Sequence, residues 1–146
     1  MNKPKIIVLY GKGHCGKTTT LNLLIEKLIS SDAVVLGGMP ASNPEENCWI
    51  VLEYQGRRIG IITVGDDGKI LDDYFHKLST DCDIYVCASR TKGSSCKYIT
   101  DTFPSILWLE KWSVSQEGNT TASLKKLRSD ANEKQAWGLI TAINAL

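Results

Sequence analysis

The glycine-rich segment, residues 11–18, is the part of the sequence whose residue types and spacing most clearly support chemistry. It fits the pattern G-x-x-x-x-G-K-[ST], in which glycines allow the backbone to curl until several N–H groups converge on phosphate oxygens. The segment consists of Gly11, Lys12, Gly13, His14, Cys15, Gly16, Lys17 and Thr18. A lysine at the start of a helix is electrostatically unfavourable unless an anion lies beside it, because the helix N-terminus already carries positive charge. We therefore predict that the segment binds phosphate groups.

Several residues of this loop have individual expected roles. Lys17 is expected to reach the β- and γ-phosphates of a nucleotide, and Thr18 to place its hydroxyl on Mg²⁺. Thr19, directly after the segment, is expected to contact the α-phosphate through its backbone N–H or its hydroxyl. His14 and Cys15 belong to the predicted binding loop but occupy variable positions, so we expect their side chains to face solvent.

Elements of regular structure flank the glycine-rich segment. A continuous apolar run at 6–10 predicts a buried parallel strand, and apolar residues at helical spacing from Lys17 onward predict a helix. The same criteria predict strands at 33–36, 49–54, 59–64, 83–88 and 106–112, and helices at 70–78, at 96–102 and from Ala122 onward. A loop is expected at 116–121, with Thr120 or Thr121 as the cap of the last helix.

The order of these elements predicts the fold class. Residues 55–58, with Gly56 among them, predict a hairpin between the runs at 49–54 and 59–64. We predict an α/β fold with three layers, in which a mostly parallel sheet carries one antiparallel hairpin at its edge. The length of 146 residues predicts a single domain over residues 1–146.

A carboxylate for the metal shell is expected at the end of a neighbouring strand. The apolar run at 59–64 is followed closely by Asp66 and Asp67. We prefer Asp66 because it comes first after the strand, whereas Asp67 and Gly68 together can form a turn. Asp66 would orient Mg²⁺ or an attacking water; the alternative is that it caps the helix predicted from Ile70.

Two cations follow the strand predicted at 83–88. Ligands of open α/β sheets bind at the carboxyl ends of strands, so Arg90 and Lys92 are placed to contact a nucleotide or phosphate, the alternative being a solvated basic loop. Residues 91–94 partly match the T-K-x-D pattern with which GTPases read guanine, but Ser94 stands where a carboxylate must accept two hydrogen bonds. ATP is therefore the expected nucleotide.

The composition excludes several classes of protein. Hydrophobic residues at 42% and charged residues at 23% are typical of a globular chain and not of a disordered one. The 17 lysines and arginines are balanced by 16 acidic residues, so the overall basic excess of a nucleic-acid-binding domain is missing. The early apolar run is too short for a signal peptide or a membrane span, and the five cysteines form no C-x-x-C pair. We expect a cytoplasmic protein with reduced thiols, no membrane span and no evident nucleic-acid patch, although the balance of charges is compatible with a local basic patch.

Five large side chains have less specific interpretations. We expect Trp108, Trp112 and Trp137, which lie in apolar segments, to be core or interface residues. Arg57 and Arg58 lie in the hairpin turn, where we expect them to be solvated.

The glycine-rich segment and the two threonines after it resemble the phosphate loop of P-loop NTPases. More narrowly, the segment is similar to the branch that carries an extra signature lysine, in the pattern K-G-G-x-G-K-[ST], which includes the partition and septum-positioning ATPases. His14 stands in place of the second glycine of that pattern. The matching residues are Lys12, Gly13, Gly16, Lys17 and Thr18. The resemblance implies a P-loop NTPase fold, ATP and Mg²⁺ as cofactors, and a nucleotide-sandwich dimer in which Lys12 reaches the partner's phosphates.

Three functions agree with these residues. The first is Mg-dependent ATP binding and hydrolysis by a switch or dimerising ATPase, with Lys17, Asp66 and Lys12 as its catalytic residues. The second is a small-molecule or nucleotide kinase, a class that usually closes an arginine-bearing lid over the phosphates, and no lid insertion is visible in this sequence. The third is a nucleotide-binding regulatory subunit with negligible turnover, with or without a protein partner.

Overall fold

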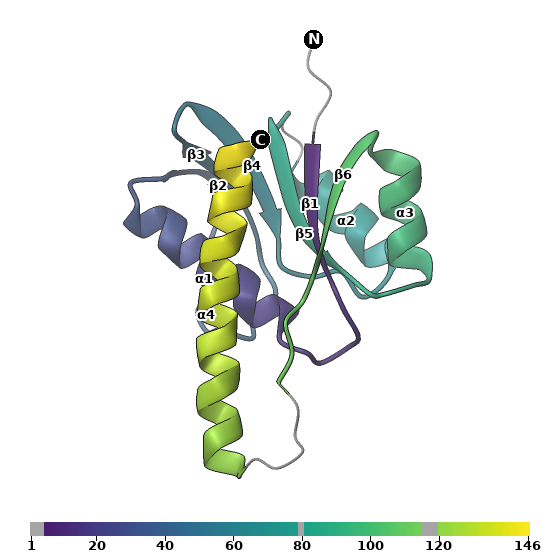
Figure 1. The fold of residues 1–146 in the computed structure, drawn as a ribbon. Coiled ribbons are helices and arrows are strands. Elements are labelled where there is room, and N and C mark those ends of the chain that lie inside the picture. The colour runs from purple at the N-terminus through teal and green to yellow at the C-terminus, as the bar shows by residue number, and fades with distance from the viewer. Residues whose placement is uncertain (1–4, 79–80, 115–119) are drawn as a thin grey trace.

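The computed structural model describes residues 5–78, 81–114 and 120–146, and these ranges form a six-stranded sheet with helices on both faces (Figure 1). The strands are β1 (Lys5–Tyr10), β2 (Val34–Gly38), β3 (Trp49–Tyr54), β4 (Arg57–Ile62), β5 (Ile84–Ser89) and β6 (Ser105–Glu110). The helices in these ranges are α1 (Lys17–Ser30), α2 (Gly68–Leu78), α3 (Ser94–Thr102) and α4 (Thr121–Ala145). The predicted order of elements is confirmed, with bounds that move by a few residues. Most of the loop predicted at 116–121 lies outside the described residues.

The strand order β2-β3-β4-β5-β1-β6 places β1 inside the sheet. It pairs in parallel with β5 on one side and β6 on the other, and β4 pairs in parallel with β5. Strand β3 is antiparallel to both β2 and β4. The prediction of a mostly parallel sheet with an antiparallel hairpin is confirmed, but the predicted position of the hairpin at the edge is wrong. Strand β2 pairs with the outer side of β3, so β2, and not the hairpin of β3 and β4, forms the edge of the sheet.

The two faces of the sheet have separate apolar cores. In β1, Ile7 and Leu9 pack with α1 and α4, whereas Ile6 and Val8 pack with α2 and α3 on the opposite face. All four side chains are fully buried, which explains the unbroken apolar run in the sequence. Burying a side chain of this size stabilises the fold by roughly 1.5–3 kcal/mol. The prediction of three layers is therefore confirmed.

The helix ends explain several polar residues. Thr120 caps α4, since its hydroxyl accepts a hydrogen bond from the Ser123 N–H at 3.2 Å. The carboxylate of Asp67 accepts from the N–H of Ile70 at 2.8 Å and so caps α2. At the other end of α4, the prediction of Arg57 as a solvated turn residue is wrong. Its guanidinium donates to the carbonyl of Ile143 in the last turn of the helix and to the main-chain oxygen of Leu146, directly after it.

The first turns of α4 project beyond the sheet, past the end at which β1 stops (Figure 1). The other end of the helix packs against the core and against α1, through residues such as Leu139 and Ile143. In the described ranges, no helix is both long and apolar enough to cross a membrane.

The three tryptophans of the apolar segments lie at the surface. The exposed fraction is 37% for Trp108, 53% for Trp112 and 50% for Trp137. Their prediction as core residues is wrong, and their role in an interface stays a prediction. Trp108 lies on the edge strand β6, Trp112 follows the end of that strand, and Trp137 lies on a face of α4. At such places apolar neighbours in the sequence do not imply burial on every side.

Candidate phosphate-binding site

The glycine-rich segment crosses the carboxyl end of the sheet between β1 and α1. The chain leaves β1 beside β5, where the N–H of Gly11 donates to the carbonyl of Ser89 at 3.1 Å. It then curls through two left-handed residues, His14 with φ of 59° and Gly16 with φ of 92°. Glycine adopts this conformation without strain, and histidine is one of the few other residue types found there. The curl directs the chain into the first turn of α1.

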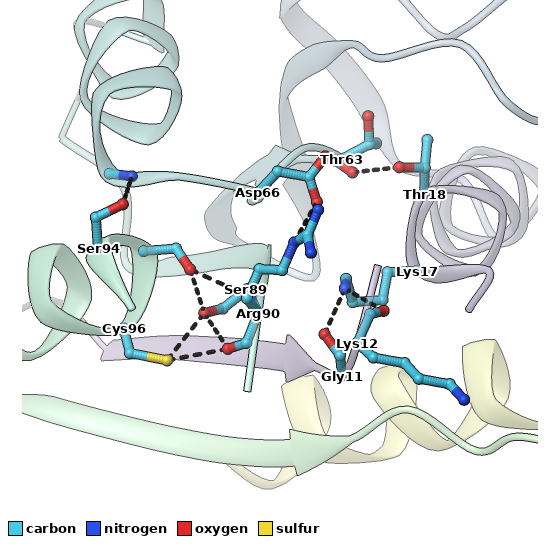
Figure 2. A network of polar contacts seen from close by, with 12 residues as sticks. Gly11, Lys12, Lys17, Thr18, Thr63, Asp66, Ser89, Arg90, Ser94 and Cys96 are labelled. Atoms are coloured by element: carbon cyan, nitrogen blue, oxygen red, sulfur yellow. Dashed lines mark hydrogen bonds and ion pairs between the residues drawn. The ribbon is translucent and has the colours of Figure 1, made fainter. Parts of the chain in front are cut away.

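The side chain of Lys17 folds back into this curl. Its ammonium donates hydrogen bonds to the carbonyl oxygens of Gly11 at 2.6 Å and Lys12 at 2.9 Å (Figure 2). Only 6% of Lys17 is exposed. Burial lowers the pKa of this ammonium below its usual value, while nearby Cys15 and Asp66 act to raise it. A positive charge is therefore held in a partly desolvated loop, where a bound anion would offset the cost of burial.

The first turn of α1 offers further donors. Its first backbone hydrogen bond runs from the N–H of Thr20 to the carbonyl of Gly16, at 3.0 Å. Within the described residues, the backbone N–H groups of Lys17, Thr18 and Thr19 have no hydrogen-bond acceptor. Unsatisfied amides at a helix N-terminus, together with the positive end of the helix dipole, attract anions. The loop and helix thus combine an ammonium and main-chain donors in one place.

The hydroxyl of Thr18 is fixed by a neighbouring strand end. It donates to the carbonyl of Thr63 at 2.9 Å (Figure 2), and Thr63 is fully buried with its own hydroxyl accepting from the N–H of Cys48. Because the Thr18 hydroxyl is the donor in this bond, its oxygen lone pairs stay available to a cation. This geometry agrees with the metal-binding role predicted for Thr18.

Asp66 lies at the same end of the sheet and pairs with Arg90. Its Oδ1 is 3.4 Å from Nε of Arg90, and both side chains are about half exposed (Figure 2). No direct bond joins Asp66 to Thr18 among the described residues, so the two predicted metal ligands share a site without touching. Asp67 instead caps α2, as described above.

Glycine at two positions permits these approaches. A Cβ atom at Gly65 would overlap the main-chain carbonyl of Ala88, which shows that the chain after β4 runs directly against the end of β5. A Cβ atom at Gly13 would lie 2.9 Å from Cζ of Arg90. Arg90 therefore lies directly over the glycine-rich segment, as its prediction as a nucleotide or phosphate contact requires.

The remaining predicted cations lie farther from this centre. Lys12 is exposed, and its side chain points away from the ammonium of Lys17 (Figure 2). Lys92 is also exposed and is not among the described residues that line the cavity around the segment. His14 is exposed and Cys15 is partly exposed, as predicted for variable positions.

The structure adds residues that the sequence interpretation missed. Lys111 directly follows β6 and is only 5% exposed, with its ammonium donating to the carbonyl of Trp112. Its side chain lies against the glycine-rich segment, since a Cβ atom at Gly11 would lie 3.2 Å from Cβ of Lys111. Burial lowers the pKa of Lys111, and Cys15 acts to raise it. The sequence held a sign of this role, because Lys111 lies at the carboxyl end of a strand, where ligands of α/β sheets bind. The strand predicted at 106–112 includes Lys111, so this position at the strand end was not recognised. Arg128 and Asn132 of α4 also line the cavity, and no local pattern indicates this.

The connection between β2 and β3 closes another side of the site. The side-chain amide of Asn22, on α1, donates to the carbonyls of Pro44 and Glu46 at 2.9 Å each. These bonds hold the connection against α1, and Glu45 lines the cavity. The sequence predicts no strand or helix between the strands at 33–36 and 49–54, and it gave no sign of this contact.

The resulting cavity has a volume of about 1230 Å³ and a strongly basic lining. Its acidic lining residues, within the described ranges, are Glu45 and Asp66. Its cationic lining residues are Lys12, Lys17, Arg90, Lys111 and Arg128. A chain with net charge of only +1 therefore concentrates positive charge in one cleft, which favours a polyanionic ligand.

Comparisons with protein-family models, with curated proteins and with solved structures find no match to this chain.

Proposed function

We propose that this protein binds a nucleoside triphosphate, by default ATP, together with Mg²⁺, and acts as a nucleotide-dependent switch or ATPase. One observation carries the proposal: the buried ammonium of Lys17 lies in a curled glycine-rich segment that opens α1. Curled glycine-rich loops of this spacing cradle phosphates with main-chain N–H groups, and a lysine there stabilises the phosphate charge.

The phosphate chain would follow the cations of the cavity. Lys17 would exchange its bonds to the loop carbonyls for bonds to the β- and γ-phosphates. Arg90 lies over Gly13 and is half exposed, so its guanidinium is free to turn from Asp66 toward a phosphate oxygen. Lys111, whose side chain lies beside Gly11 and Gly16, would supply a second buried ammonium.

The residues present suit a Mg²⁺ ion that arrives with the nucleotide. Mg²⁺ is commonly held by one or two protein oxygens, substrate phosphates and water, so a cage of several carboxylates is unnecessary. No cluster of three or more potential metal ligands occurs among the described His, Cys, Asp and Glu residues. Thr18 would hold the ion with its hydroxyl oxygen, and Asp66 would contact it or its water shell. Bound there, Mg²⁺ neutralises charge on the phosphates.

Turnover would depend on Asp66. Once Arg90 pairs with phosphate, the Asp66 carboxylate can accept a hydrogen bond from a water and orient it. Lys12 lines the cavity with an exposed side chain, which leaves it able to reach the phosphates of a second copy. The proposed function therefore includes a homodimer in which Lys12 of one copy contacts the phosphates bound by the other. All five cysteines are described and carry free thiols, which supports a reducing compartment such as the cytoplasm.

Isothermal titration with Mg·ATP tests the binding step. We expect Lys17→Ala to lower the affinity at least 100-fold, because it removes the charge that faces the phosphates. Lys97→Ala is the matched control: Lys97 is an exposed lysine on α3 whose ion pair is with Asp101, so its loss should leave binding unchanged. The proposal fails if wild-type protein does not bind Mg·ATP, or if Lys17→Ala binds it as tightly as wild type.

A turnover assay then separates the possible activities. We expect ADP release from wild-type protein without any acceptor, and its loss in Asp66→Asn. ADP release only in the presence of a metabolite would identify a kinase instead. Tight binding with no ADP release would identify a regulatory subunit.

A further inference from the structure

Trp112 occupies an unusual place for a large aromatic side chain. It follows Lys111 at the end of β6 and lines the same cavity as the glycine-rich segment. About half of the residue, 53%, is exposed. An indole left half open to a basic cavity offers a flat apolar surface beside the phosphate-binding groups.

The backbone of Trp112 is held firmly at this place. Gln135 of α4 is 5% exposed; its Oε1 accepts from the N–H of Trp112 at 2.9 Å, and its Nε2 donates to the carbonyl of Glu110 at 2.7 Å. The ammonium of Lys111 donates to the carbonyl of Trp112. Three hydrogen bonds from two buried polar side chains therefore fix the chain around one exposed aromatic residue. These bonds hold the main chain from which the indole projects, and preorganisation of this kind lowers the entropic cost of binding.

We propose that Trp112 is the platform on which the base of the bound nucleotide stacks, with Gln135 as its positioning residue. The inference rests on the proposed function, since the glycine-rich segment must hold the phosphates. A nucleoside triphosphate anchored there extends its base out of the loop, and the cavity continues along the wall formed by Trp112 and α4. Stacking on an aromatic ring suits any nucleobase, because every base has a π-face. The site then selects nucleotides over inorganic polyphosphate.

Inorganic tripolyphosphate is the probe that separates the base from the phosphates. We expect wild-type protein to bind both Mg·ATP and tripolyphosphate in calorimetry. Trp112→Ala should lose about tenfold in affinity for Mg·ATP and retain its affinity for tripolyphosphate. Trp112→Phe, which keeps an aromatic face, should retain most of the Mg·ATP affinity. Gln135→Ala should weaken Mg·ATP binding alone, a selective change that a purely structural role would not produce.

Trp137 provides the matched control. It is also half exposed, but it lies against Lys27, with Nζ 4.7 Å from the ring centroid, and it is not among the described residues of the cavity. Trp137→Ala should bind both ligands as wild type does. Intrinsic fluorescence gives a second measurement: Mg·ATP should quench the emission of wild type and of Trp137→Phe, but not that of Trp112→Phe.

The outcomes distinguish this inference from the function on which it rests. If wild-type protein binds neither ligand, the proposed function fails and the inference fails with it. If both ligands bind and Trp112→Ala loses neither, or loses both to the same extent, the stacking platform alone is overturned. If Trp112→Ala does not fold, the Trp112→Phe fluorescence result decides: quenching that persists in that variant overturns the inference.

Discussion

The substitution Gly65→Ala tests how the two carboxyl-end loops of the site are brought together. Gly65 lies between the end of β4 and Asp66, and a Cβ atom there would overlap the carbonyl of Ala88 and lie 2.8 Å from the nitrogen of Ser89. Carbon atoms normally approach a carbonyl oxygen no closer than about 3.3 Å, so the chain after β4 would have to move by roughly 1 Å or more. Both partners are backbone, and neither can turn aside as a side chain would.

The cost follows from this geometry. Overpacking that side chains can partly absorb costs about 1–3 kcal/mol, and here the backbone of β4 and β5 must separate, so we expect the upper end, about 3 kcal/mol. For a domain of this size, that corresponds to a fall in melting temperature of about 6–12 °C. The same displacement moves Asp66 away from Arg90, so the proposed Mg·ATP turnover should fall more than the loss of stability explains.

Thermal denaturation followed by circular dichroism measures the first effect, and a turnover assay at a temperature where both proteins are folded measures the second. Gly37→Ala is the control, because a Cβ atom there meets only Cζ3 of Trp49, at an ordinary 3.8 Å. A Gly65→Ala protein that melts within about 2 °C of the Gly37→Ala protein would refute the reasoning, because it would show that β4 and β5 do not approach this closely.

Three further perturbations test other contacts. Arg57→Ala removes two charged hydrogen bonds of 2.8 Å to the main-chain oxygens of Ile143 and Leu146 and should cost about 2 kcal/mol in urea denaturation, whereas Arg58→Ala should have little effect. Asn22→Ala, which releases the β2–β3 connection, should cost about 2 kcal/mol and speed limited proteolysis within residues 39–47; unchanged cleavage would argue against the anchor. Burial raises the pKa of the Cys82 thiol from 9.0 to about 11, so the stability that its neutral form contributes is complete below pH 9 and is lost as the pH rises toward 11. Melting temperatures between pH 8 and 11 should decline less steeply in Cys82→Ala, and equal slopes would contradict this assignment.

Local patterns predicted the order of elements because their causes act within a few residues. The apolar run of β1 is continuous because both of its faces are buried, and the spacing of apolar residues in α1 follows one helix face. The Thr120 cap and the curl at Gly16 likewise depend on their nearest neighbours. Such features leave the same signal in any fold that contains them.

The order of strands in the sheet was harder to predict from the sequence. The hairpin of β3 and β4 was predicted, but β2 pairs on its outer side, and β5 lies between β1 and β4. Pairing partners depend on which edges meet during packing, and residue types along one strand do not record this. The partner of Asp66 followed from that arrangement: with β5 next to β4, the acid meets Arg90.

The sequence by itself determined the conformation of the glycine-rich segment, since glycines, a lysine and a threonine at fixed spacing between a buried strand and a helix specify a curled loop with an ammonium inside it. Tertiary structure alone decided what surrounds that loop. Lys111 and Trp112 follow the end of β6, which is parallel to β1 and ends at the same edge of the sheet. Arg128 comes from α4, and all three residues line the same cavity. A loop's own conformation is set by neighbouring residues, but its walls are set by long-range packing.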